Sequence, residues 1–143
     1  MVAENVSIAS QPQRNLPPLW KKSAARILVV DDESLVRWSV TETLQSHGYE
    51  VEEAVDAASA MRAFDADYDL VLLDLHLPDA TDMRVLRYIR ATAPSVPVIL
   101  MTAFATREVV EDAVALGASV AAKPFDLDDL ANTVEQALLG RVY

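Results

Sequence analysis

Ile27-Leu-Val-Val-Asp-Asp-Glu33 is the stretch that decides the fold, because four apolar residues are followed at once by three acidic ones. A short, continuous apolar run rich in β-branched residues is typical of a strand that is covered on both faces. The same pattern returns at Leu70–Leu73 and at Val96–Met101, and weaker candidates lie at 51–55 and 120–122. Five such strands, separated by helical sequence, predict a buried parallel sheet.

Helical patterns separate these apolar runs. In the first of them, Val36, Val40, Leu44 and His47 share one stripe at helical spacing, and Gly48 supplies a left-handed stop. The predicted helices cover residues 34–47, 57–64, 83–92, 106–116 and 127–139.

The caps and connections support the same architecture. Thr106 and Asp126 are expected N-caps, and Gly117 is an expected C-terminal stop. Strands that alternate with helical crossovers form a parallel sheet with helices on both faces. The expected fold is therefore an α/β, doubly wound (βα)₅ domain with the flavodoxin-like strand order 2-1-3-4-5. In such folds the functional site lies at the carboxyl ends of the strands, near the switch point between strands 1 and 3.

Length and charge bound the domain organisation and the partners. The 143 residues predict one domain at 26–143 behind a flexible, proline-containing leader at 1–25. The Leu16–Trp20 segment of the leader is interpreted either as a loosely packed tail or as a docking motif. The formal charge is −10, and residues 26–143 alone carry −12. A domain with this much negative charge repels the phosphate backbone of nucleic acids. Direct binding of nucleic acid is therefore not expected.

The sequence also indicates the compartment. There is no cysteine, which excludes disulfides and thiolate metal sites. The first residues contain no secretory apolar run, and the apolar runs elsewhere are too short to span a bilayer. We expect a cytoplasmic protein without membrane insertion.

Five polar residues directly follow the predicted strands: Asp31 and Asp32, Asp74, Thr102 and Lys123. Three neighbouring carboxylates repel one another, and a hard divalent cation such as Mg²⁺ relieves the repulsion. A hydroxyl and an ammonium group are suited to hold phosphate oxygens. Taken singly, each of these residues is more often a turn former or a helix cap. Their conjunction predicts a carboxylate that accepts a phosphoryl group beside a cation.

The motifs around these residues resemble the receiver domains of two-component response regulators. The resemblance runs from Arg26 to about Leu139, and the pairing of Val36-Arg-Trp-Ser39 with Met101-Thr-Ala-Phe104 is most similar to receivers of the nitrogen-regulation type of sigma-54 activators. The motifs that carry it are Ile27–Glu33, Leu72-Leu-Asp-Leu-His-Leu-Pro78, Met101-Thr-Ala103 and Ala122-Lys-Pro-Phe125.

The resemblance implies a role for each site residue. Asp74 is the implied phosphoacceptor, supplied by a sensor histidine kinase or a histidine phosphotransferase. The implied Mg²⁺ ligands are Asp31, Asp32, Asp74 and the main-chain carbonyl of His76, and the implied phosphoryl-binding groups are Thr102, the Ala103 amide and Lys123. The Lys123–Pro124 bond is expected to be cis. The chain is not expected to be an enzyme, beyond slow loss of its own phosphoryl group.

Three departures from the family pattern affect these expectations. Val120 occupies the switch position, where the family usually has an aromatic residue, and Asp82 stands where a glycine is usual. We expect Asp82 to reshape its loop and to cap the next helix. His76 and Phe104 lie two residues beyond Asp74 and Thr102, and we expect them to flank the path of a hydrolytic water.

Partner contacts are predicted at two places. Trp38 lies about 200° around its helix from Val36, opposite the buried stripe, and is interpreted as a partner contact or as packing under the leader. The resemblance also implies a homodimer face on the fourth helix, fifth strand and fifth helix. After Leu139 only Gly140–Tyr143 remain, so no output domain is expected, and the signal is expected to pass to a downstream protein partner.

The same residues leave two other functional classes open. A receiver-fold interaction module that is never phosphorylated is favoured by Val120 and Asp82, and it is opposed by the intact acidic residues, threonine and lysine. An aspartyl phosphatase is opposed by His76, because such enzymes usually carry a second aspartate at that position.

Overall fold

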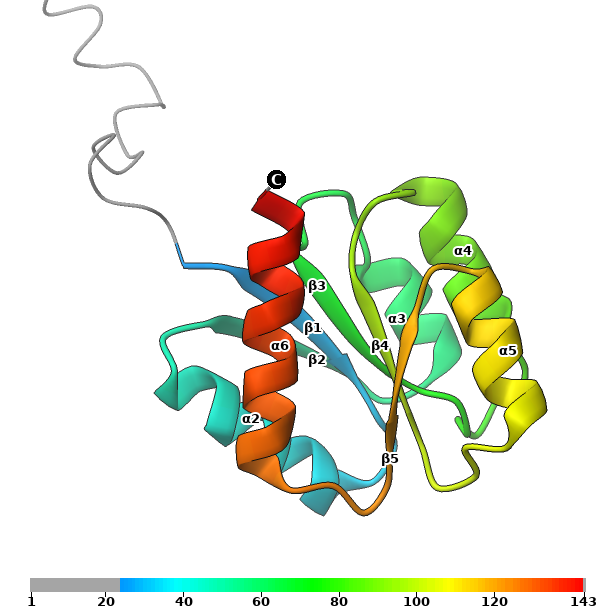
Figure 1. Ribbon diagram of the computed structural model, residues 1–143, viewed down its shortest axis with the longest axis horizontal. Helices are drawn as coiled ribbons and strands as arrows, with labels where there is room; N and C mark the ends of the chain where they lie inside the picture. The colour runs from blue at the N-terminus through cyan, green and yellow to red at the C-terminus, as the bar shows by residue number, and fades with distance from the viewer. Residues whose placement is uncertain (1–23, 143) are drawn as a thin grey trace, which may run out of the picture.

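The computed structural model describes residues 24–142 and contains a five-stranded parallel sheet in the order β2-β1-β3-β4-β5 (Figure 1). The predicted fold class and strand order are confirmed. The predicted leader lies outside the described residues, except for Ala24 and Ala25. In chain order the elements are β1 (Arg26–Val30), α2 (Ser34–Ser46), β2 (Glu50–Ala54), α3 (Ala57–Ala63), β3 (Leu70–Asp74), α4 (Arg84–Thr92), β4 (Val98–Thr102), α5 (Arg107–Ala115), β5 (Ser119–Ala122) and α6 (Leu127–Val142).

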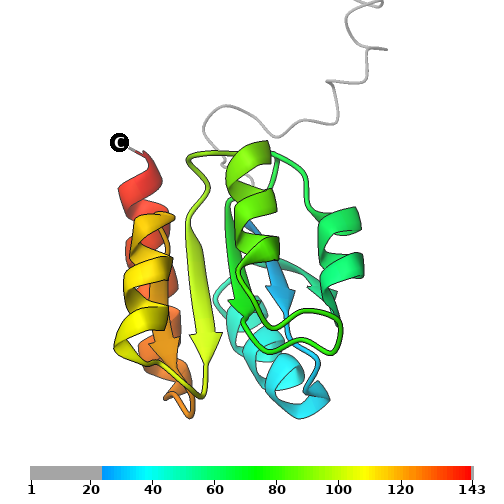
Figure 2. The ribbon, with the colours of Figure 1, turned by 90° about the vertical axis from the view of Figure 1, so that its right-hand side faces the viewer.

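The central strands are buried because helices cover both faces of the sheet, as the two views show (Figures 1 and 2). α2 and α6 cover one face, where Val40 and Val134 join the core. α3, α4 and α5 cover the other face, where Leu86 and Ala113 join a second core cluster. Side chains of β1 alternate between the clusters, as the strand period of two requires. This explains why the strands read as continuous apolar runs.

Parallel pairing brings the carboxyl ends of the strands to one edge of the domain. The strands run toward the lower edge in Figures 1 and 2, and the C-terminal end of α6 lies at the opposite edge. Val30 pairs with Leu73, and Thr102 pairs with Ala122, so the residues that follow each strand converge. None of the helices in residues 24–142 is long and apolar enough to cross a membrane.

Local stops and caps were predicted well. Gly48 has φ +89° and Gly117 has φ +73°, the left-handed conformation that glycine adopts without steric cost. The Thr106 side chain caps α5 by accepting a hydrogen bond from Val109 N, and the Asp126 carboxylate accepts from Asp128 N and Asp129 N at the start of α6.

Several predicted element boundaries differ from those of the structure by one to three residues. His47 does not belong to the buried stripe, because α2 ends at Ser46 and the His47 side chain is exposed at the C-cap. Its ring Nδ1 lies 2.8 Å from the Thr43 carbonyl oxygen, a contact within its own turn. β4 begins at Val98 because Val96 N donates to Ala93 O in a turn, and α4 begins one residue after Met83.

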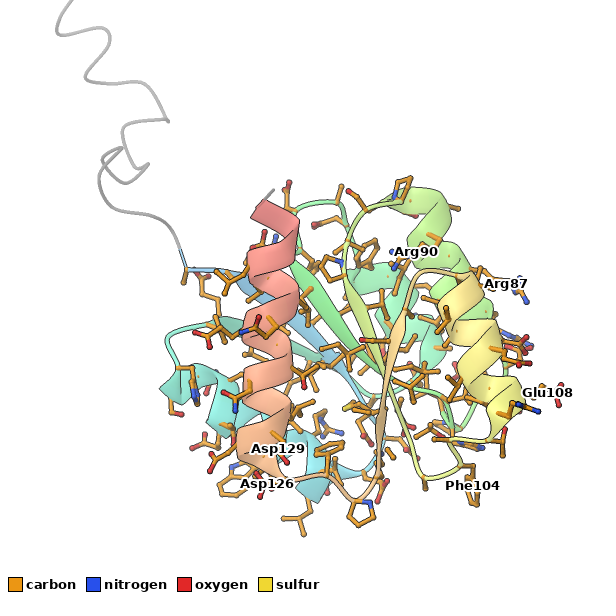
Figure 3. The ribbon with its side chains drawn as sticks, in the orientation of Figure 1. Arg87, Arg90, Phe104, Glu108, Asp126 and Asp129 are labelled. Carbon is orange, nitrogen blue, oxygen red and sulfur yellow. The ribbon has the colours of Figure 1, made fainter. Side chains whose placement is uncertain are left out.

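Arg90 ties α4 to the turn between α5 and β5 (Figure 3). Its guanidinium group donates to the carbonyl oxygens of Val96 at 2.6 Å and of Gly117 at 3.0 Å. Charge-assisted bonds to several carbonyls fix the relative positions of these segments. The helical layer behind β4 and β5 is therefore held at its far end, away from the carboxyl edge.

Candidate functional site

The carboxyl edge brings together the five residues that the sequence predicted. Asp31 follows β1, Asp74 ends β3, Thr102 ends β4, and Lys123 follows β5. Hydrogen bonds continue the strand ladders to these positions: Asp31 N donates to Ala54 O, and Lys123 N donates to Thr102 O at 2.8 Å. The backbone therefore fixes where each functional side chain starts.

Three carboxylates form a group that fits a divalent cation. One oxygen from each of Asp31, Asp32 and Asp74 lies within 4.8 Å of the others. Asp31 is fully buried and Asp74 nearly so, whereas Asp32 is exposed. Hard oxygen ligands with access to water are the set that Mg²⁺ prefers, since it retains several water ligands. The chemistry of the donor set therefore fits the predicted ion.

The two buried carboxylates have different partners. Asp31 Oδ1 accepts from Glu33 N at 2.9 Å, and its Oδ2 accepts from Lys123 Nζ at 2.7 Å. Asp74 Oδ1 accepts from His76 N at 3.1 Å, and its Oδ2 lies 3.5 Å from Lys123 Nζ. Lys123 thus contacts both carboxylates, and its shorter bond is to Asp31.

Burial and like charge raise the pKa of the Asp74 carboxyl above its usual range. Loss of water around the carboxylate is the larger cause, and the Asp31 charge adds to it. The His76 amide and the Lys123 ammonium group act in the opposite direction. The protein thus compensates the charge of Asp74 only in part, which suits a position beside a cation.

The ammonium group of Lys123 is held in its charged form. Burial acts to lower its pKa, but hydrogen bonds to Asp31 and Glu33, together with the charges of Asp74 and Asp31, raise the pKa overall. Its side chain is only 12% exposed. The Lys123–Pro124 peptide bond is cis, as predicted.

The threonine side of the site is arranged differently. Thr102 is buried, and its Oγ1 accepts a hydrogen bond from Phe104 N at 3.0 Å. Ala103 and Phe104 are exposed, and the Phe104 side chain projects from the loop between β4 and α5 at the lower edge (Figure 3). The ring centroids of Phe104 and His76 are 5.2 Å apart. The two rings therefore contact each other, and the expectation that they flank the path of a hydrolytic water stays a prediction.

A groove of about 450 Å³ adjoins the site between α2 and the segment that follows β5. One part of the groove is lined by residues of the site, namely Glu33, Ala103 and Lys123, and the rest is lined by apolar residues such as Leu35 and Phe125.

Trp38 is 60% exposed on α2, as its position opposite the buried stripe predicted.

The remaining predicted positions are placed as follows. Val120 is partly buried, packs against the core cluster behind β4 and pairs with Leu100. The Asp82 carboxylate accepts from Arg84 N at the start of α4, where Met83 is the N-cap residue. The alternative that Asp31 or Asp32 caps α2 is not realised, because α2 has no side-chain cap.

Sequence reasoning missed two functional contacts. Glu33 Oε1 accepts a hydrogen bond from Lys123 Nζ at 3.1 Å, although the acid stands in the quoted motif directly after Asp32. Asp79 accepts from Ala57 N and Ala58 N and so ties the loop after β3 to α3. The position of Glu33 three residues after the end of β1 was a usable signal, whereas the contact of Asp79 depends on the path of its loop.

The fold and the acidic group at its carboxyl edge indicate a class of protein, and comparison with known proteins identifies that class. The family model of the response regulator receiver domain matches residues 27–135. This chain belongs to that family and is a receiver domain of the kind found in two-component signalling.

Individual relatives agree with the predicted subtype. The chain is 38% identical to the regulatory protein AtoC of Escherichia coli K12 over 79% of this chain and 25% of that protein. It is 35% identical to the DNA-binding transcriptional regulator NtrC of Azospirillum brasilense over 81% of this chain and 24% of that protein. The resemblance to receivers of the nitrogen-regulation type is confirmed. The chain spans about a quarter of the length of these relatives.

A solved structure shares the fold. The CheY-like response regulator receiver domain protein of Methanospirillum hungatei JF-1 superposes with a TM-score of 0.76 at 29% identity. The match covers 83% of this chain and 97% of that one.

Proposed function

We propose that this receiver domain accepts a phosphoryl group on Asp74 from a phosphohistidine of a sensor kinase or phosphotransferase. The observation that carries the proposal is the convergence of three carboxylates within 4.8 Å beside a partly buried lysine at the carboxyl edge. Asp74 ends the central strand β3, so its carboxylate is presented at the middle of this edge.

The chemistry is an in-line displacement at phosphorus. A carboxylate oxygen of Asp74 forms the new O–P bond while the N–P bond of the phosphohistidine breaks, and the leaving imidazole nitrogen takes up a proton. Lys123 Nζ, 3.5 Å from Asp74 Oδ2, is in position to donate to the incoming phosphoryl oxygens. Because the acceptor pocket is already negative, charge neutralisation is the main requirement.

Asp31, Asp32 and Asp74, with the main-chain carbonyl of His76, are the proposed ligands of Mg²⁺. When bound, the ion supplies positive charge that offsets repulsion between the carboxylates and the phosphoryl oxygens. The His76 amide already donates to Asp74 Oδ1, so the turn after β3 keeps this carboxylate oriented.

Thr102 and the Ala103 amide are the proposed donors to a further phosphoryl oxygen. The Thr102 hydroxyl accepts from Phe104 N, which leaves its own proton available for donation. To donate toward Asp74, the β4–α5 loop has to shift. Because Val120 is a branched aliphatic residue packed in the core, we propose that the shift is transmitted without the usual aromatic relay.

The α2 face is the proposed contact surface for the phosphodonor protein. Exposed Leu35 and Trp38 lie about one turn apart on α2, and Leu35 lines the groove that leads to Lys123. ATP-dependent histidine kinases supply such phosphohistidines inside the cell, which supports a cytoplasmic location. A homodimer through α5, β5 and α6 and a downstream protein partner remain further proposals.

The proposal is tested by mass spectrometry after incubation with a small phosphodonor and Mg²⁺. We expect one labile phosphoryl adduct on the wild type, none on Asp74→Asn, and an unchanged adduct on the exposed control Asp82→Asn. An adduct that persists in Asp74→Asn overturns the assignment. No adduct on the wild type favours the phosphorylation-independent interaction module instead.

A further inference from the structure

Lys123 has a third carboxylate partner that the proposed function does not use. Its Nζ lies 2.7 Å from Asp31 Oδ2, 3.1 Å from Glu33 Oε1 and 3.5 Å from Asp74 Oδ2. The lysine is thus drawn toward the β1 side of the site and away from the phosphoacceptor. Glu33 differs from the other two acids because its side chain is 60% exposed and lines the mouth of the groove.

We infer that Glu33 is a positioning residue, which holds Lys123 toward Asp31 and competes with phosphoryl oxygens for its ammonium group. This inference rests on the proposed function of Asp74. It assigns to Glu33 an effect on how strongly the site holds a cation and how strongly it holds a phosphoryl group.

The backbone around Glu33 is built to keep it there. Glu33 N donates to Asp31 Oδ1, and Glu33 O accepts from Arg37 N in the first turn of α2. Arg37 in turn donates from Nη1 to Asp31 O and pairs through Nε with Glu53. The turn between β1 and α2 is therefore fixed on both sides of Glu33, and its side chain starts from a defined place.

The negative charge of Glu33 should have opposite effects on the affinity of the site for a phosphoryl group and on its affinity for a divalent cation. An ammonium group has three N–H donors, so each bond to Glu33 is a donor that a phosphoryl oxygen does not receive. The Glu33 carboxylate also repels an incoming phosphoryl group. Toward a divalent cation the same carboxylate acts favourably, because it adds negative charge and keeps the lysine ammonium group away from Asp74.

The test uses Glu33→Gln, which removes the charge and keeps the length and an acceptor oxygen. We expect the dissociation constant of Mg²⁺ to rise about twofold to threefold, as for a partly screened charge. At saturating Mg²⁺, we expect the dissociation constant of beryllofluoride, a phosphoryl mimic, to fall about twofold to fivefold. Both constants are read from amide chemical shifts of His76 and Ala103 in NMR titrations.

The matched control is Glu42→Gln, an exposed acid on α2 whose substitution changes the net charge identically. We expect it to leave both constants at the wild-type values, because long-range charge alone is screened by salt. A purely structural role of Glu33 would weaken both ligands together. Changes of the same sign, or changes no larger than those of Glu42→Gln, overturn the inference.

The proposed function fails in a different way. If the wild type binds neither Mg²⁺ nor beryllofluoride, the assignment of the site is wrong, and the inference about Glu33 falls with it. If the wild type binds both and Glu33→Gln behaves as the wild type, only the role of Glu33 is wrong.

Discussion

The two halves of the site are held by different kinds of contact. On the β1 and β3 side, Asp31 and Asp74 are buried, and the partly buried Lys123 joins them through ion pairs between residues more than 40 positions apart. On the β4 side, the buried Thr102 hydroxyl accepts its hydrogen bond from Phe104 N in the adjoining turn, and the loop that follows is exposed.

The difference separates assembly from switching. Long-range ion pairs in a buried place hold charges together before any ligand arrives, which is what electrostatic stabilisation of phosphoryl transfer requires. A hydroxyl that is satisfied only by its own turn can exchange partners without breaking the core. The acidic half is therefore the part that receives the group, and the threonine half is the part that can respond to it.

Removing the lysine is the strongest way to break the assembled half. Lys123→Met leaves fully buried Asp31 without its ammonium partner, so we expect unfolding in urea to show a loss of about 3 kcal/mol. Mg²⁺ should recover part of the loss, because it binds the folded state. Arg107→Met, at an ion pair that is almost fully exposed, is the control and should leave the urea midpoint unchanged. An equal effect of the two substitutions would show that the ion pair of Lys123 and Asp31 contributes no more to the free energy of unfolding than an exposed ion pair does.

Removing the phosphoacceptor charge should instead stabilise the assembled half. At pH 7 we expect Asp74→Asn to unfold at about 2 kcal/mol higher free energy, because a poorly compensated buried charge is lost. The pKa of Asp74 is raised in the folded state, so ionisation of Asp74 lowers the free energy of unfolding as pH rises through the folded-state pKa. At a pH where Asp74 is protonated in both the folded and the unfolded protein, it has no such effect. The gain should therefore shrink as pH falls toward about 4.

Calorimetric melting of both proteins across this pH range measures the effect, and Mg²⁺ provides an internal check. The ion should stabilise the wild type more than Asp74→Asn, because the variant lacks one ligand charge. A gain that is independent of pH would mean that the Asp74 charge is not its origin.

The threonine half should be less sensitive to substitution. Thr102→Val keeps the shape and removes the acceptor of Phe104 N, and we expect a loss of about 1 kcal/mol in urea unfolding. Thr102→Ser keeps the acceptor and is the matched control. If Thr102→Val costs as much as Lys123→Met, the two halves are equally rigid and the distinction between them is wrong.

The smallest effect on stability is expected at Phe104, whose side chain is 63% exposed. Phe104→Ala should change the free energy of unfolding by less than about 0.5 kcal/mol. The His76 and Phe104 rings contact each other two residues beyond Asp74 and Thr102. If this pair of rings shields the phosphoryl group from water, the half-life of phosphorylated protein should shorten about threefold in Phe104→Ala. Val114→Ala, equally exposed on α5, is the control. An unchanged half-life would contradict a shielding role of Phe104.

Much of the site could be predicted from the sequence because the relevant residues directly follow apolar runs. Asp31, Asp74, Thr102 and Lys123 all lie where that rule placed them. The rule did not extend to His47, which keeps the helical spacing of the stripe but lies beyond the last helical residue. The helical spacing of apolar residues continues in the sequence past the end of α2. The helix itself does not continue, because the backbone turns at Gly48.

The sequence by itself determined the strand order, the two-sided core and the set of side chains at the carboxyl edge. These features follow from the hydrophobic pattern of short segments and from the order of those segments along the chain. Only the tertiary structure decided that Lys123 binds Asp31 and Glu33 more closely than Asp74, and that Asp79 reaches the start of α3. Such pairings depend on differences of less than an ångström between segments far apart in the chain. Local hydrophobic patterns do not encode distances of that kind.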